Sequence, residues 1–140
     1  MGQSTDGILC YGFCLDEDAE YPWTVDEESM DFEDYLATLG GLSEPETSNY
    51  EDRSWKTYWR RKEANAESIG VDLVCHCSDE CPMYILAAHD SVKVANRGTP
   101  EELGQTLHIG MHWKEDLYQF CQKAGVEFKE PQWILCSMWG

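Results

Sequence analysis

Three closely spaced cysteines and a neighbouring histidine are the residues of this chain whose types most resemble a metal site. Residues 75–81 read CHCSDEC. Zinc prefers four thiolate or imidazole ligands in a tetrahedron. The weak candidates are Cys75, Cys77 and Cys81, with His76, His89 or His108 as a fourth ligand. However, C-x-C-x3-C is not a standard zinc-finger spacing, and no second CxxC pair is present. In a strand, Cys75 and Cys77 would share one face and His76 the other, so the alternative is a set of structural side chains.

Other reactive patterns are weaker. His108 and His112 have the spacing of a helical metal chelate, but no Glu follows His108 as zincins require, and Gly110 between them weakens a helix. The cluster Asp16-Glu17-Asp18-x-Glu20 lacks the turn glycine of a calcium loop. No GxSxG elbow or cysteine-protease signature is present. The sequence therefore predicts a non-enzymatic protein without a cofactor.

Negative charge is concentrated at the amino-terminal end. The 140 residues carry a formal net charge of −17. Fifteen of the 27 acidic residues lie in residues 1–52, which contain no Lys or Arg, and the other twelve share residues 53–140 with all ten bases. Such a charge repels nucleic acid and anionic lipid. The partners it favours are basic surfaces and cations.

The acidic segment, residues 16–52, has two interpretations. Charge runs usually form a solvated surface that aids solubility. Alternatively, Glu27, Asp31 and Asp34 form a row of carboxylates along one helix, spaced by about 5.4 Å per turn, much like the phosphates of a nucleic-acid strand. Aromatic residues between the acids would then anchor a partner, because Trp and Tyr dominate binding hot spots. This hypothesis predicts the partner-binding residues Asp16, Glu17, Asp18, Glu20, Tyr21, Trp23, Glu27, Asp31, Phe32 and Asp34.

The elements that would position these residues follow from periodicity and caps. Residues 7–15 are typical of a buried strand. Thr24 and Glu27 fit a capping box, which predicts a helix from there to Gly40. A second helix follows from Arg53, with aromatics that can pack on a sheet and bases that can meet the acidic helix. Strands are predicted at VDLVCHC, MYILAAH and SVKVAN, a short helix at Thr99-Pro100, a longer one from about Met111 to Gly125, and a last strand at QWILCSMW.

Together these elements predict a single compact α+β domain over residues 1–140. The domain has a mixed sheet of about four to five strands, together with three helices, in the order β-α-α-β-β-(β)-α-β. The amino terminus has neither the basic nor the apolar region of a signal peptide, and no apolar run is long enough to span a membrane. We therefore expect a cytoplasmic protein whose seven reduced cysteines are mostly core residues.

Three segments carry a resemblance to a known group of proteins. QSTDGILCYGF at the start, CPMYILA in the middle and WILCSMWG at the end resemble small proteins encoded by tailed bacteriophages and prophages. The resemblance assigns no residue a role. It implies an accessory viral protein in a bacterial host cytoplasm, where small acidic phage proteins often inhibit host defence, as anti-CRISPR and anti-restriction proteins do.

The sequence hypothesis is therefore a phage-encoded, non-enzymatic inhibitor. Its acidic residues would mimic nucleic acid and occupy the basic surface of a host defence protein, without direct contact to nucleic acid or membrane. Two alternatives stay open: a small metal-binding or enzymatic domain using the Cys/His cluster, and a structural or accessory phage protein.

Overall fold

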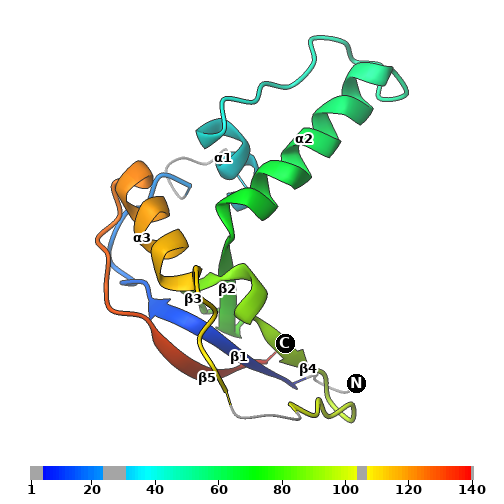
Figure 1. The fold of residues 1–140 in the computed structure, drawn as a ribbon. Helices are drawn as coiled ribbons and strands as arrows, with labels where there is room; N and C mark the ends of the chain where they lie inside the picture. Colours follow the sequence, from blue (N-terminus) through cyan, green and yellow to red (C-terminus); the bar gives the residue numbers. More distant parts are fainter. Residues whose placement is uncertain (1–4, 24–30, 104–106, 140) are drawn as a thin grey trace.

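A computed structural model describes residues 5–23, 31–103 and 107–139 of the chain. The elements follow the predicted order, which confirms an α+β fold with a mixed five-stranded sheet and three helices (Figure 1). They are β1 (Thr5–Cys14), α1 (Phe32–Leu39), α2 (Arg53–Ile69), β2 (Val71–Ser78), β3 (Pro82–Ala88), the 3-10 turn η1 (His89–Ser91), β4 (Lys93–Ala95), α3 (Trp113–Ala124) and β5 (Gln132–Trp139).

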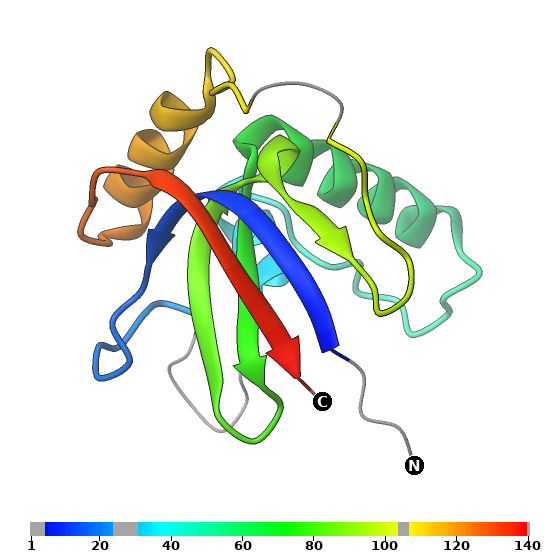
Figure 2. The same ribbon diagram turned by 90° about the horizontal axis from the view of Figure 1, so that it is seen from below.

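The first strand organises the sheet because it pairs with three others. It runs antiparallel to β5 along most of its length, to β4 near its start and to β3 at its end. Strand β2 pairs antiparallel with β3 and parallel with β5 at Cys77 and Ser78. The strands β1, β3, β2 and β5 therefore close into a ring, and Figure 2 shows the strong curvature that this requires.

The ring separates two apolar cores. Successive side chains of a strand point to opposite faces, so Ile8 and Cys10 of β1 face the interior of the ring, with Ile85. Tyr11 and Phe13 face outward and pack with Leu117 and Phe120 of α3. Burial raises the pKa of the Cys10 thiol to about 12 and that of Cys121 to about 11, so both are protonated core residues. Three of the seven free cysteines are exposed, namely Cys14, Cys77 and Cys81, and Cys75 and Cys136 are half-buried. The expectation that most of the thiols lie in the core is therefore wrong, because only Cys10 and Cys121 are buried.

A buried serine joins the 3-10 turn to the central strand. The Ser91 hydroxyl accepts a hydrogen bond from the Tyr11 amide at 2.9 Å and donates one to the Ala88 carbonyl at 2.6 Å. Ser91 is 1% exposed. Since water cannot reach these groups, the serine satisfies polar backbone atoms that the curved sheet leaves without a strand partner.

Helix α2 packs differently from the prediction. Its Trp55 side chain packs on the preceding loop rather than on the sheet: the indole N–H donates to the Thr47 carbonyl at 2.9 Å, and the Tyr50 ring lies 4.9 Å from that of Trp55. Only the second half of the helix meets α1, where the Asn65 amide donates to the Leu36 carbonyl at 2.7 Å. The amino-terminal end of α2 projects away from the sheet (Figure 1).

Two predicted helices differ in extent. Helix α1 begins at Phe32 with Asp31 as its N-cap, and the predicted start at Thr24 lies outside the described residues. The predicted helix at Thr99-Pro100 is wrong for residues 99–103, which form exposed, non-helical chain after a turn at Gly98. Such a short segment has no apolar side to bury, and isolated short helices are marginal. Among the described residues, no helix is long and apolar enough to cross a membrane.

Candidate functional site

The acidic loop after β1 meets the tip of the β2–β3 hairpin and encloses a pocket with it. This loop–hairpin pocket has a volume of about 400 Å³. Two groups of candidates that lie far apart in the sequence, the acidic segment and the cysteines, thus share one site. The loop supplies Leu15, Asp16, Glu17, Ala19, Tyr21 and Trp23, and the hairpin supplies Cys77, Glu80, Cys81, Pro82, Met83 and Tyr84.

Several contacts hold the loop in place. The Leu15 amide donates to the Tyr84 carbonyl at 3.0 Å, which continues the contact between β1 and β3. The Asp16 amide donates to the Tyr21 hydroxyl at 2.9 Å, and the Asp16 carboxylate pairs with Lys129 at 2.8 Å. The loop is therefore closed on itself and fixed to the hairpin and to the segment before β5.

The rim of the pocket is anionic. Glu17 and Glu80 line the pocket and are exposed, and so are Asp18, Glu20 and Asp79, which are their near neighbours in the chain. In the described parts of the chain, none of these five carboxylates has an ion-pair partner, whereas Asp16 has Lys129. The rim consequently presents negative charge without a counter-ion from the protein.

The aromatic residues of the acidic segment are mainly core residues. Trp23 is 5% exposed and contacts Phe32 at 5.1 Å and Phe120 at 6.0 Å between ring centroids. Trp23 therefore offers a partner little ring area, less than its predicted anchoring role requires, and Phe32 is half-buried against the same ring of α3. Tyr21 stacks on Trp23 with the planes at 8° and forms part of the pocket wall. The core thus supports the aromatic floor of the pocket.

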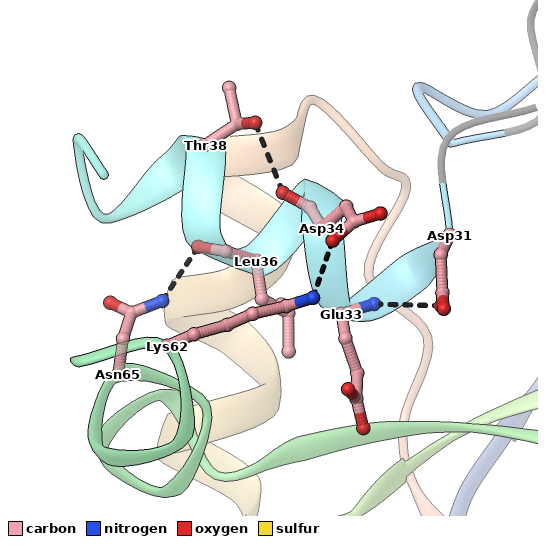
Figure 3. A network of polar contacts seen from close by, with 7 residues as sticks. All are labelled: Asp31, Glu33, Asp34, Leu36, Thr38, Lys62 and Asn65. Carbon is pink, nitrogen blue, oxygen red and sulfur yellow. Dashed lines mark hydrogen bonds and ion pairs between the residues drawn. The ribbon is translucent and has the colours of Figure 1, made fainter. Parts of the chain in front are cut away.

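Two of the three carboxylates in the predicted row, those of Asp31 and Asp34, make structural contacts (Figure 3). The Asp31 side chain caps α1 by accepting a hydrogen bond from the Glu33 amide at 3.1 Å. Asp34 forms an ion pair with Lys62 of α2, and this contact raises the pKa of Lys62. Glu27 lies outside the described residues. Asp31 and Asp34 stabilise the helical part of the molecule, and the exposed charge of the candidate site comes from residues 17–20 instead.

The cysteines do not come together with the histidine proposed as a ligand. Cys77 pairs with Pro82 at one end of the β2–β3 hairpin, whereas His89 follows Ala88, which pairs with Val71 at the other end. Six residues of strand separate these ends by roughly 20 Å, so His89 is not a ligand partner of the cysteines. Among the described residues, no three Cys, His, Asp or Glu side chains lie close enough to hold a metal ion.

The three hairpin thiols have separate environments. Cys75 is half-buried. Burial is the main cause that raises the pKa of its thiol, and the nearby negative charge of Asp79 adds to this effect. The thiol also forms a hydrogen bond with Tyr84. Cys77 adopts a φ of 79°, an unusual conformation for a residue with a side chain. Cys77 at this kink and Cys81 in the hairpin turn are both exposed and line the pocket.

The remaining histidines are also dispersed. Burial lowers the pKa of His76, and its Nε2 atom is buried without a hydrogen-bond partner in the described parts of the chain. His112 precedes α3, and residues 107–110 are not helical, so His108 and His112 do not form the helical chelate. His89 instead pairs with Asp72, with Nδ1 and Oδ2 2.8 Å apart.

Sequence reasoning singled out Cys77 and Cys81 but missed the other hairpin residues of the pocket. Met83 and Tyr84 have the pattern of ordinary strand residues, and Glu80 has that of a turn residue. Only the pairing of β1 with β3 brings them beside the acidic loop. No short-range signal in the sequence encodes that contact.

Comparisons with known proteins give no relative for this chain. No protein-family model, no curated protein and no solved structure matches it.

Proposed function

We propose that the protein is a non-enzymatic inhibitor that binds the basic, nucleic-acid-binding surface of a host protein through the loop–hairpin pocket. The observation that carries this proposal is a set of exposed carboxylates without an ion-pair partner in the part of the chain that the structure describes, beside aromatic side chains: Glu17 and Glu80 line the pocket with Tyr21 and Tyr84, and Asp18 and Glu20 lie in the same loop. Surfaces that bind phosphate backbones are rich in Lys and Arg. A rim of this kind would attract them and compete with nucleic acid.

The way in which the loop is held supports this function. Hydrogen bonds to Tyr84 and Tyr21 and the Lys129 ion pair order the loop before any partner arrives. Binding then costs less conformational entropy than it would for a flexible acidic tail. Tyr21 and Tyr84 supply apolar area and ring faces beside the carboxylates, which suit the long stems and cationic ends of Lys and Arg.

A host defence protein is proposed as the partner because of the resemblance to phage-encoded proteins. In this view the site of action is the cytoplasm of the bacterial host. The partner supplies the basic surface, and the inhibitor contacts neither nucleic acid nor membrane.

The test compares two matched charge reversals. Glu17→Lys/Asp18→Lys changes the rim, and Glu101→Lys/Glu102→Lys makes the same change in charge at exposed residues away from the pocket. Proteins captured from a bacterial lysate by the wild-type chain are isolated, and displacement of a labelled DNA duplex from them is measured at increasing salt. We expect the wild type and the control variant to displace the duplex, the rim variant to lose at least about tenfold in potency, and salt to weaken the effect. Equal potency of the two variants, or captured proteins that keep their DNA, would refute the proposal.

A further inference from the structure

A second cavity lies between α1, α2 and the start of β2, on the other side of the Trp23–Phe32 contact from the loop–hairpin pocket. This α1–α2 pocket has a volume of about 500 Å³. Its lining combines apolar side chains of the two helices, including Leu36 and Trp59, with the carboxylates of Glu33, Glu63 and Glu67. A cavity with a flat aromatic wall and carboxylates beside it suits an organic cation.

The two basic residues of the pocket are already paired. Lys62 forms its ion pair with Asp34 (Figure 3), and Asp34 is not part of the lining. His89 is paired with Asp72 at 2.8 Å. In the described parts of the chain, Glu33, Glu63 and Glu67 have no ion-pair partner. The pocket therefore has negative charge to offer to a cation from outside.

Helix geometry aligns the aromatic and acidic groups. Glu63 and Glu67 follow Trp59 at intervals of four residues, so the three side chains lie one above the other on the same side of α2. The Trp59 side chain is 47% exposed. Its ring lies 5.6 Å from that of the buried Trp55, which supports one side of the indole. The helix thus presents an open ring next to two carboxylates, about one turn apart.

We propose that the α1–α2 pocket binds the guanidinium group of an arginine side chain from the partner protein. A guanidinium group is planar, stacks on an indole and donates paired hydrogen bonds to carboxylates. The compact ammonium of lysine matches the flat wall less well. This proposal rests on the proposed function for one point only, that the arginine comes from a basic protein surface. The α1–α2 pocket and its residues are different from those of the loop–hairpin pocket.

The test uses small probes in place of the partner. N-acetyl-arginine amide is titrated into isotope-labelled protein while the indole N–H signal of Trp59 is followed by NMR. N-acetyl-citrulline amide is the neutral control of the same shape, and N-acetyl-lysine amide tests the preference for guanidinium. We expect the arginine probe to shift the Trp59 signal at millimolar concentrations, and both other probes to bind at least about tenfold more weakly.

Matched variants locate the site. Glu63→Gln/Glu67→Gln should weaken the arginine probe about tenfold or more, and Glu101→Gln/Glu102→Gln should leave its affinity unchanged. Equal responses to arginine and citrulline, equal binding of lysine, or indifference to the Glu63/Glu67 change would overturn the proposal. Tighter binding of free L-arginine than of the amide would overturn the assignment to a protein side chain. Because the rim variant and DNA displacement are not involved, failure here is distinguishable from failure of the proposed function.

Discussion

Gly12 of β1 lies against the backbone of Leu86 in β3 so closely that a Cβ atom at position 12 would stand 2.0 Å from the Leu86 carbonyl oxygen. Gly12 is also the residue that pairs with Ala87 on one side and with Gln132 on the other. The absence of a side chain at this position allows the ring of strands to close. The close approach of β1 and β3 at Gly12 also brings the acidic loop beside the hairpin, so the candidate site depends on this glycine.

We expect Gly12→Ala to lower the free energy of unfolding by about 3 kcal/mol, the upper end of the range for overpacking, because the clashing atoms belong to the backbone. The control is Gly7→Ala in the same strand, where the nearest atom to an added Cβ is the Ala95 carbonyl oxygen at 3.9 Å. This control should keep or slightly raise stability, by up to about 1 kcal/mol. Urea unfolding of both variants checks the prediction. Equal midpoints for the two would contradict a steric role of Gly12.

Local patterns predicted most of the elements. The apolar stripe with Leu117 and Phe120 and the glycine at position 125 define α3, whose end the structure places at Ala124 with Gly125 in the left-handed conformation. Strong caps act similarly at α2, which is bounded by Asp52 and Gly70. These features depend on residues within one or two turns of each other, so they can be read without knowledge of the fold.

The site could be predicted only in part because its contacts are long-range. Nothing near Trp23 distinguishes a buried ring from an exposed anchor; Phe120, almost a hundred positions later, decides it. Likewise, the match between Asp34 and Lys62 depends on how α1 crosses α2. The acidic loop was predicted as part of a binding surface, but its partner in the pocket, the hairpin tip, follows from the closure at Gly12.

Two histidines should give stability opposite dependences on pH. Burial lowers the pKa of His76, so this imidazole binds a proton more readily in the unfolded chain than in the native state. Below the ordinary value of 6.5 this difference lowers the stability of the native state as pH falls. The hydrogen bond to Asp72 raises the pKa of His89, so its contribution is complete below 6.5 and is lost as pH rises through the higher, folded-state value.

Urea unfolding between pH 5 and 8 separates these contributions. His76→Gln should flatten the loss of stability on the acidic side. His89→Gln should remove a contribution that is largest at acidic pH, and that contribution should stay below about 1 kcal/mol because the pair is half-exposed. His112→Gln serves as the control on an exposed histidine. If His76→Gln leaves the acidic side unchanged, the imidazole of His76 is hydrated rather than buried.

Thiol reactivity tests the placement of the pocket and of the ring interior together. Cys10 and Cys14 lie in the same strand, yet Cys10 is fully buried with a pKa of about 12, and Cys14 is exposed. Since the thiolate is the reactive form, iodoacetamide at pH 8 should modify Cys10 and Cys121 at least about a hundredfold more slowly than Cys14, Cys77 and Cys81. Peptide mapping by mass spectrometry at successive times measures these rates, and the difference should vanish in urea. Slow modification of Cys77 and Cys81 in the native protein would mean that the hairpin tip is covered and the loop–hairpin pocket closed, whereas rapid modification of Cys10 would mean that the ring of strands opens in solution.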